Sequence, residues 1–490
     1  MLRMENVTLW AIIGCYLFVM IILGEVCARY KIKGLDDYLV AGRKHGILIT
    51  SGTLIATVIG AGSTIGASGV AFYVGISASW YLLSACVGLI LLAFTFAPVM
   101  RRMSLYTIPQ FIENRYGIVA GSIAVGLGII GLIMFLSAQI YAMGILTFQL
   151  TTLPLTLTII ISGLVVVFYT WRGGNWAVQW SDTIQTGWII VGMVVVSLVG
   201  IKLVGGISNF STPPIAKGFE PLGPQWFNPM TQQLCTPWDI FALGNVVVGW
   251  TIMSITWHFT MQSTAQRLLS SKDPSTAKYA CVIAAGVIVP LGLVVALSGM
   301  TARVLYPTLP PTSDIAQGGA FPALVQGILN PVLGGVVLAA LIAVVMSTCD
   351  SALLGASTIL VKDVYQRWFN PRVSDHTLLR ISQHFTLIIG LAAIGTALSI
   401  PTLIKMLEMV ATVYCIAIFV PIILGLYWKG ANSQGAIAAM VVSAVVGLGW
   451  RMGGFEKDMG VHMLNISLPL SFITMVIFSL LMKEPRKKME

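Results

Sequence analysis

The decapeptide GAGSTIGASG, Gly60 to Gly69, interrupts an apolar run that extends over 46–74. Glycine costs about 1 kcal/mol per helical position relative to alanine, so this stretch is a poor helix former. In lipid, unwound backbone is tolerated only where it is buried in protein or lines a cavity. The stretch therefore predicts one of two features: a broken helix at a transporter binding site, or a small-residue face for close helix packing.

The composition of the whole chain places this stretch in a membrane. Of the 490 residues, 57% are hydrophobic and 9% are charged, and the mean hydropathy is +0.89. Soluble domains carry roughly 25% charged residues. We therefore predict an all-α, multi-pass protein of the cell (plasma) membrane with the lipid bilayer as its surroundings. The net charge of +10 fits basic cytoplasmic loops, and we predict no nucleic-acid partner.

Thirteen apolar segments are long enough to span a bilayer, which takes about 20 residues. They fall at 7–28, 46–74, 77–99, 118–148, 153–171, 180–203, 239–265, 276–303, 329–358, 379–399, 402–428, 432–451 and 464–482. With the N-terminus outside, 21 of the 28 Lys and Arg residues, Arg267 among them, fall on the inside and 6 on the outside. This bias predicts an outside N-terminus and an inside C-terminus.

The spans divide into two units of five, which predicts a pair of inverted repeats within a single transporter domain over 1–490. Repeat one covers 46–203 and repeat two covers 239–428, with an extra helix over 7–28 and two more over 432–482. In inverted-repeat transporters a break recurs at the corresponding helix of the second half. That helix is 239–265, where Gly244 and Gly249 precede a polar and aromatic patch.

Acidic side chains within spans are costly, and they indicate functional sites. Asp350 follows a long apolar run, and on a helix it shares one face with Ser347 and Ser351, with Thr348 close by. Carboxylate and hydroxyl oxygens suit a hard cation such as Na⁺, although hydroxyl residues also allow close helix packing. Asp182 is a second intramembrane acid, and its alternative role is to cap the helix that begins there.

Three motifs in order make the chain resemble the sodium:solute symporter family. They are DDYLVAGR from Asp36 to Arg43, followed by GISASW; WSDTIQ from Trp180 to Gln185; and AVVMSTCDSALLGAS from Ala343 to Ser357. The resemblance covers nearly the whole chain and implies the inverted five-helix-repeat (LeuT-like) fold of sodium-coupled amino-acid transporters. It also implies a role for Arg43 in sodium coupling, and the alternative role of this arginine is an orientation charge at the cytoplasmic side.

The resemblance assigns cation ligands residue by residue. The common sodium site of the family corresponds to the carbonyl groups of Ala56, Ile59 and Val344 and the hydroxyl groups of Ser347 and Thr348. The second cation site of some members corresponds to Asp182, Ser347, Asp350 and Ser351. Asp350 stands where some relatives have Ser, which favours a cation or proton role. Val58 stands where proline carriers have an acid, so proline is not the favoured substrate.

We therefore expect a symporter rather than an enzyme, with Na⁺ as the coupling ion and no other metal or cofactor. It would carry a small organic solute, amino-acid-like or carboxylate, into the cell by alternating access. The expected substrate contacts are Gly60, Gly62, Ser63, Gln139, Tyr141, Trp257, His258 and Gln262. Proton coupling on the same fold and a solute sensor acting through a separate partner are the alternatives. The sequence carries no signal for an oligomeric state.

Overall fold

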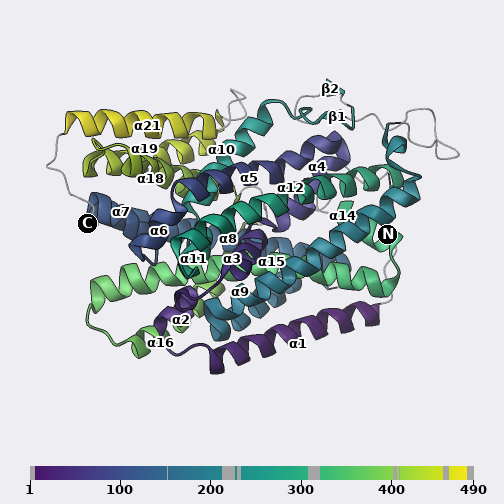
Figure 1. Ribbon diagram of the computed structural model, residues 1–490, viewed down its shortest axis with the longest axis horizontal. Helices are drawn as coiled ribbons and strands as arrows, with labels where there is room; N and C mark the ends of the chain where they lie inside the picture. Colours follow the sequence, from purple (N-terminus) through teal and green to yellow (C-terminus); the bar gives the residue numbers. More distant parts are fainter. Residues whose placement is uncertain are drawn as a thin grey trace.

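The computed structural model describes residues 6–151, 153–211, 227–228, 233–234, 236–306, 320–400, 406–407, 409–455 and 463–482. Over these residues the regular elements are helices, apart from one short antiparallel pair, β1 (Phe227–Asn228) and β2 (Gln233–Leu234), and an isolated bridge between His45 and Ser271. Most helices run along one common direction, as Figure 1 shows. The first residue of α1 and the last residue of α21 lie at opposite ends of this bundle.

The first half of the chain builds nine α-helices. They are α1 (Asn6–Tyr30), α2 (Leu35–Val40), α3 (Ile47–Val58), α4 (Ala67–Val74), α5 (Trp80–Phe94), α6 (Ala97–Met103), α7 (Ile108–Tyr116), α8 (Ile118–Leu150) and α9 (Leu155–Val204). The predicted spans 153–171 and 180–203 both lie in α9, which bends at Gly174. Gly174 has a φ of +53°, and a Cβ there would lie 2.5 Å from the Tyr38 ring, so the bend requires glycine.

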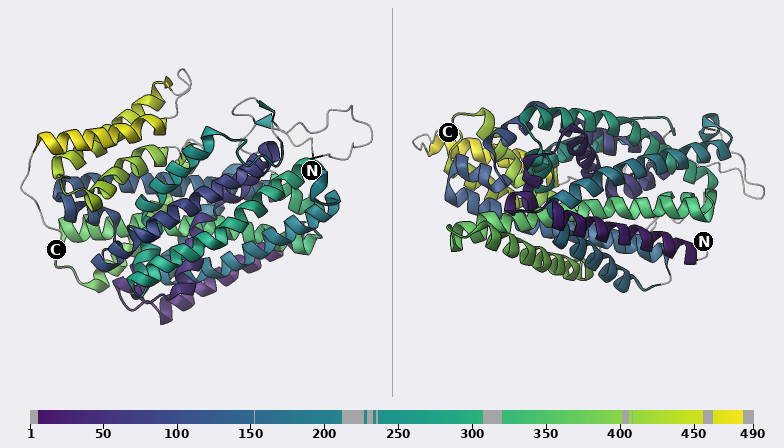
Figure 2. Two further views of the ribbon diagram at one scale, coloured as in Figure 1. Left: turned by 45° about the horizontal axis from the view of Figure 1, so that its top comes forward. Right: turned by 60° about the horizontal axis from the view of Figure 1, so that its bottom comes forward.

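The described part of the second half contains α10 (Asn245–Thr260), α11 (Gln262–Ser270), α12 (Pro274–Leu305), α14 (Ala320–Ile328), α15 (Pro331–Ile359), α16 (Asp375–Ser399), α18 (Ala417–Tyr427), α19 (Ser433–Met452) and α21 (Met463–Leu481). The pair α19 and α21 packs together on the opposite side of the bundle from α1 (Figures 1 and 2). Helix α15 lies in the middle, where it contacts α1, α8, α9 and α11.

Within the described residues, eight helices are long and apolar enough to cross a membrane, and three shorter apolar helices accompany them at Ile47–Val58, Val246–Thr260 and Val413–Tyr427. The helices Ile47–Val58 and Val246–Thr260 are each one half of a broken span, so neither is long enough to cross a membrane alone. The count of thirteen spans and the orientation of the termini remain predictions.

The predicted break in the first core span is present, and the backbone leaves the helical conformation at Ile59. Helix α3 ends at Val58, Ile59 is extended with φ −83° and ψ 93°, and the chain resumes as a π-helical turn over Gly62–Gly66 that leads into α4. The Ser63 hydroxyl accepts a hydrogen bond from the Gly60 N–H at 2.8 Å and donates to the Val58 carbonyl at 2.9 Å. One side chain thus satisfies backbone groups on both sides of the break.

The second broken span differs from its prediction in where it breaks. Helix α10 ends at Thr260, Met261 is extended, and α11 begins at Gln262. Gly249 lies inside α10, and Gly244 lies just before it, so the glycine signal was wrong as a marker of the break. Side chains from other parts of the chain stabilise this break. The Tyr414 hydroxyl donates to the Thr260 carbonyl. The Gln262 side chain bonds the Ile108 N–H and the Tyr106 carbonyl, at 2.9 and 2.8 Å.

Close packing of α4 against α12 provides a test of the fold. A Cβ at Gly299 would lie 2.1 Å from the Ser68 carbonyl oxygen, whereas a Cβ at Gly286 on the same helix would meet nothing within 4 Å. We expect Gly299→Ala to destabilise the protein by about 1–3 kcal/mol because the backbones must separate. Gly286→Ala is the control and should leave stability unchanged or raise it. Heating the purified protein in detergent measures both; equal melting temperatures would contradict this packing.

Candidate cation and substrate site

The α3 break and α15 face each other at the centre of the bundle. Ala56 lies in the last turn of α3 and Ile59 directly follows the helix. Both are 1% exposed, and carbonyl groups at a helix end lack helical partners. A Cβ at Gly60 would lie 3.1 Å from the Thr348 hydroxyl oxygen of α15, so glycine allows this close approach. The break at Gly60 therefore lies beside the Thr348 hydroxyl of α15.

Three groups of α15 complete this oxygen-rich region. Val344, Ser347 and Thr348 are at most 2% exposed. Both hydroxyls donate to the Val344 carbonyl, at 2.7 Å from Ser347 and 3.2 Å from Thr348. Because their protons point to that carbonyl, their lone pairs remain available to a cation. The arrangement fits a hard monovalent ion held by backbone and hydroxyl oxygens.

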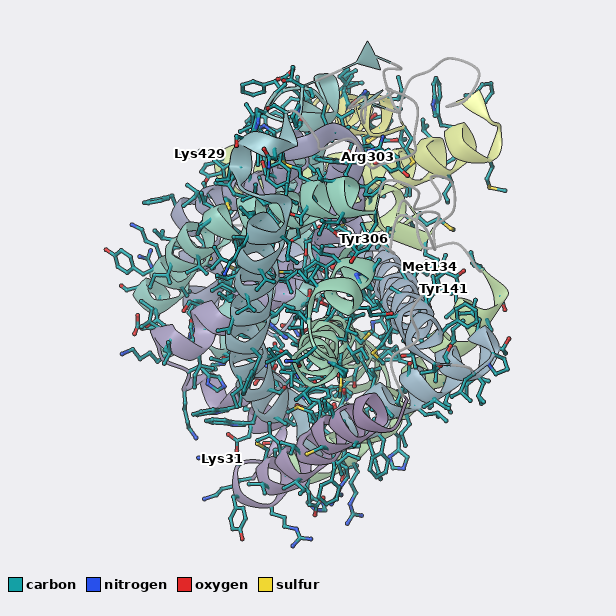
Figure 3. All side chains as sticks on the ribbon, turned by 90° about the vertical axis from the view of Figure 1, so that its right-hand side faces the viewer. Lys31, Met134, Tyr141, Arg303, Tyr306 and Lys429 are labelled. Carbon is teal, nitrogen blue, oxygen red and sulfur yellow. The ribbon has the colours of Figure 1, made fainter. Side chains whose placement is uncertain are left out.

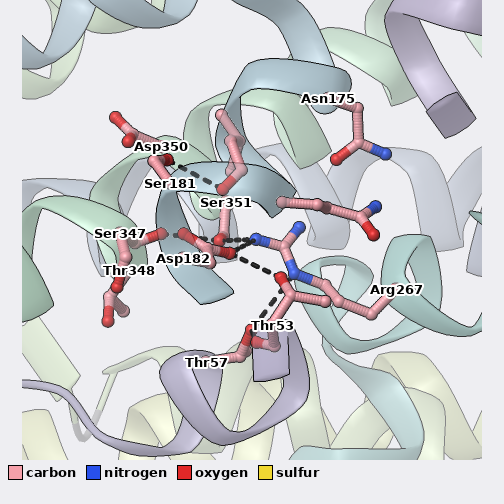
Figure 4. A network of polar contacts seen from close by, with 12 residues as sticks. Thr53, Thr57, Asn175, Ser181, Asp182, Arg267, Ser347, Thr348, Asp350 and Ser351 are labelled. Carbon is pink, nitrogen blue, oxygen red and sulfur yellow. Dashed lines mark hydrogen bonds and ion pairs between the residues drawn. The ribbon is translucent and has the colours of Figure 1, made fainter. Parts of the chain in front are cut away.

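Asp182 lies beside this region but already has a cationic partner. Its carboxylate accepts from the Thr53 hydroxyl at 2.5 Å and from the Arg267 guanidinium at 2.8 Å. The side chains of Asp182 and Arg267 are both 0% exposed. Arg267 also donates to Ser351 and, through Nε, to the Thr57 hydroxyl at 3.1 Å. In Figure 4 the Ser347 hydroxyl points toward Asp182 on the side away from Arg267.

Asp350 is fully buried and has a different partner from Asp182. It accepts a hydrogen bond from the Thr170 hydroxyl of α9 at 2.7 Å. Among the described residues, its second oxygen has no hydrogen-bond partner. Asp182 and Asp350 are expected to share one cation site, but within the described part of the chain their hydrogen bonds go to different partners.

The position of Arg267 corrects the count of Lys and Arg residues in inside loops, because Arg267 is buried. It is also the main site residue that the sequence did not predict. The sequence predicts an inside loop for Arg267, because the apolar span ends near residue 265. The break at Met261 starts a new helix that carries Arg267 into the core, where its exposure is 0%. Thr53, Thr57 and Thr170 were missed as well. A hydroxyl every fourth residue on α3, at Thr53 and Thr57, was the available signal, since that spacing defines one helix face.

A cavity of about 850 Å³, partly open to solvent, lies against the break. Its described lining is Thr57, Val58, Gly60, Gly62, Ser63, Tyr81, Leu82, Ala85, Phe135, Gln139, Trp250, Met253, Ser254, Trp257, His258, Thr264, Thr348 and Leu407. Thr348 borders both the cavity and the oxygen-rich region, so the two sites adjoin.

Six of the eight expected substrate contacts line this cavity: Gly60, Gly62, Ser63, Gln139, Trp257 and His258. Tyr141 does not line it, because residues 139 and 141 point to different sides of α8; Figure 3 labels Tyr141 together with Met134 of the same helix. Gln262 also lies elsewhere, with its amide bonded to the backbone of the α6–α7 connection. Tyr81, Phe135 and Trp250 are aromatic members that the sequence did not single out.

The lining combines aromatic rings with a few polar groups. Trp257 packs edge-on against Phe135 with ring centroids 4.9 Å apart, and His258 Nδ1 lies 2.7 Å from the Ser254 carbonyl. None of the described lining residues has a charged side chain. Among the described residues, the Gln139 Oε1 atom has no hydrogen-bond partner. It is therefore available as an acceptor for a solute N–H or O–H group.

We expect Gln139→Leu to raise the solute concentration for half-maximal uptake about tenfold, because a buried hydrogen bond to the solute is lost. The sodium requirement should stay unchanged. Ser137→Ala is the matched control on the same helix, since its hydroxyl bonds the Ile133 carbonyl at 2.7 Å and is outside the cavity lining. Initial uptake rates measure both variants; an altered sodium requirement with normal solute affinity would contradict this role.

Arg43 closes the end of the bundle that the charge bias predicts to be cytoplasmic. Its guanidinium donates to the carbonyls of Ser104 and Leu105, at 2.8 and 3.0 Å, and to that of Leu269 at 3.3 Å. It also lies over the Tyr106 ring. Tyr106 donates to the Asp36 carboxylate, and burial together with that carboxylate raises the pKa of Tyr106 to about 12. The tyrosine therefore stays protonated and keeps this bond at neutral pH.

Comparison with known proteins identifies relatives along the whole chain. Residues 38–443 match the profile of the sodium:solute symporter family. The chain is 27% identical to sodium/myo-inositol cotransporter 2 of Mus musculus, over 99% of this chain and 78% of that protein. It is 26% identical to an osmoregulated proline transporter of Bacillus subtilis, over 97% and 95%. It is 27% identical to the sodium/pantothenate symporter of Escherichia coli, over 88% of each.

Solved structures share the fold. The structure of a Na⁺-coupled sialic acid symporter in a substrate-bound outward-open state superposes with a TM-score of 0.81 at 19% identity, over 98% of this chain and 99% of that one. A nucleobase-cation-symport-1 family transporter gives a TM-score of 0.53 at 15% identity, over 91% and 92%. At these identities the likeness concerns the fold alone.

Proposed function

We propose that this chain, which belongs to the sodium:solute symporter family, imports a small polar organic solute across the cell membrane with inward-moving Na⁺. Sodium-coupled solute symport is the activity of the family and of the named sodium-coupled relatives. The observation that carries the proposal is the junction at Thr348. There an oxygen-rich region of α3 and α15 meets a cavity lined by the same helix break.

We assign the sodium ion to the carbonyls of Ala56, Ile59 and Val344 and the hydroxyls of Ser347 and Thr348. An ion bound there joins α3 to α15 and stabilises the conformation in which the break faces the cavity. Because Gly60 and Ser63 of the same break line that cavity, the solute binds best to this conformation. Each ligand then raises the affinity for the other, as thermodynamic linkage requires.

The membrane potential supplies much of the driving force. One positive charge crossing 100 mV releases about 2.3 kcal/mol. At about 1.4 kcal/mol per tenfold ratio, this supports roughly 50-fold accumulation of a neutral solute. A sodium concentration gradient adds to that ratio. Alternating access converts the release into uptake when only the fully loaded and the empty carrier change conformation.

The cavity favours a solute with one polar end and an apolar body. The polar end meets Gln139, Ser63 and the N–H groups at the start of the helix after the break, which attract carboxylates and other acceptors. The body packs on Trp257, Phe135 and Tyr81. Since no described lining side chain is charged, a carboxylate or amino-acid-like solute would depend on these N–H groups and on the bound sodium.

Proton coupling is the second candidate, and the buried Asp350 favours it. Its unpartnered oxygen gives the carboxyl group room to carry a proton, and intramembrane acids serve as proton relays in other transporters. In that case uptake would follow a proton gradient, and Ser347 and Thr348 would have no role in the ion requirement.

Reconstitution into proteoliposomes tests the proposal. A panel of amino acids, carboxylates, polyols, sugars and vitamins is offered with an inward sodium gradient and an inside-negative potential. At least one solute should accumulate and should fail to do so with potassium in place of sodium. A chain that moves no solute in either condition would contradict the proposed function and favour a sensor role.

A further inference from the structure

The second cation position expected of this fold already holds a positive charge that belongs to the chain. Asp182 and Ser351, two of the four side chains assigned to that position, both bond the Arg267 guanidinium. All three side chains are buried with 0% exposure. Two of the four assigned side chains are therefore already bonded to a cation that is covalently attached to α11.

We propose that Arg267 is a built-in cation that replaces a second sodium ion, so that this carrier couples solute uptake to one Na⁺. The proposal rests on the sodium-coupled function proposed above. It assigns a stoichiometry that neither the family nor the fold fixes. In this role Arg267 is a positioning residue, because it acts through Asp182 and touches neither the solute nor the transported ion.

The donor pattern of the guanidinium supports the assignment. Its Nη2 atom donates to Asp182 at 2.8 Å and to Ser351, and its Nε atom donates to the Thr57 hydroxyl at 3.1 Å (Figure 4). Carboxylate and hydroxyl oxygens are also the ligands that sodium would need. The guanidinium therefore uses Asp182 Oδ2 and the Ser351 hydroxyl, two of the oxygen atoms that sodium would need. Among the described residues, Asp182 Oδ1 has no hydrogen-bond partner, so a sodium ion bound to it would share the carboxylate with the guanidinium.

The local charge balance leads to the same result. Arg267 and Asp182 form a neutral pair in a region without solvent exposure. A sodium ion added beside Asp182 would lie next to the guanidinium, and two like charges at short range repel strongly in a low-dielectric interior. Asp350 bonds Thr170 rather than the pair. Among the described residues of this region, Asp350 is therefore the acid that Arg267 does not bond.

Arg267 also joins the two broken spans. It lies on α11, after the Met261 break, and it reaches Thr57 on α3, two residues before Ile59. Asp182 comes from α9 and Ser351 from α15. A free sodium ion would hold these helices only when bound, whereas Arg267 holds them at every stage. We therefore expect cooperativity in sodium to be absent from the wild-type protein.

Sodium titration of purified wild type and of Arg267→Gln tests this inference. Wild type should bind about one Na⁺ per chain, and uptake should rise with sodium with a Hill coefficient of about 1. Arg267→Gln frees Asp182 for an ion, so binding should rise to about two Na⁺ and the Hill coefficient toward 2. The melting temperature of Arg267→Gln should then depend more on sodium, relative to potassium, than that of wild type.

Two further variants control for charge and for folding. Arg267→Lys keeps a tethered cation and should retain one Na⁺ per chain. Arg303→Gln removes a cation that lies over the Phe72 ring instead, and it should leave the sodium count unchanged. If Arg267→Gln fails to fold, the wild-type count and Arg267→Lys still decide the question.

Two outcomes separate this inference from the proposed function. Sodium-driven uptake with two Na⁺ per solute in wild type would overturn the role of Arg267 alone, as would an Arg267→Gln protein that binds one Na⁺ with unchanged affinity. Loss of all sodium dependence in wild type would overturn the proposed function as well. The ratio of charge to solute moved at a fixed potential measures this count independently.

Discussion

Replacing Ser347 or Thr348 by Ala is expected to raise the sodium concentration for half-maximal uptake roughly tenfold to hundredfold. Each hydroxyl supplies one oxygen ligand, and losing a buried polar partner costs about 1–3 kcal/mol. The effect on solute selectivity should be small, because Ser347 lies outside the cavity lining and Thr348 only borders it. Uptake of one solute over a range of sodium concentrations at fixed potential measures this change.

Ser357→Ala is the matched control for both variants. Ser357 lies on the same helix and is equally buried, but its hydroxyl donates to the Ser382 carbonyl at 2.9 Å. It should therefore keep the wild-type sodium requirement, even if its stability falls slightly. A normal sodium requirement in Ser347→Ala and Thr348→Ala would show that the ion binds elsewhere.

Asp182→Asn should be the most destabilising of the substitutions considered. It removes the carboxylate that neutralises Arg267, and breaking a buried ion pair from one side typically costs about 3–5 kcal/mol. We expect a strongly lowered melting temperature in detergent and little uptake. Because Arg267 remains charged, adding sodium should not restore stability.

The double variant Asp182→Asn with Arg267→Gln distinguishes this cause from a general loss of packing. Replacing both charged partners removes the unpaired charge, and such replacements are often close to neutral in stability. The double variant should therefore be more stable than Asp182→Asn alone. Equal stability of the two would mean that the ion pair does not account for the loss.

Much of the fold follows from the sequence because lipid imposes simple rules on it. Apolar length predicted the long helices, among them α1, α8, α12 and α15, but it did not predict short helices such as α2, α7 and α14. The glycines at 60 and 62 predicted the first break. The second break had no such signal. Met261 is an ordinary helix former whose extended backbone depends on Tyr414 and on the bonds of Gln262, from elements more than 150 residues away in sequence. Tertiary contacts of this kind leave no local pattern.

The difference between local patterns and tertiary contacts also explains which parts of the site could be predicted. Ser347, Asp350 and Ser351 lie at i, i+3 and i+4 of one helix, so their common face could be predicted from spacing, as could the pairing of Thr348 with Ser351. Arg267 could not be placed, since an arginine after an apolar run is usually a loop residue. Its position depends on the break at Met261, and its partner Asp182 lies 85 residues away.

The most direct measurement is uptake by wild-type proteoliposomes with sodium and proton gradients imposed separately at equal membrane potential. The account predicts accumulation under the sodium gradient and none under the proton gradient in sodium-free buffer. It also predicts that the double variant Ser347→Ala with Thr348→Ala regains uptake only at much higher sodium. Equal accumulation under the proton gradient without sodium would contradict it.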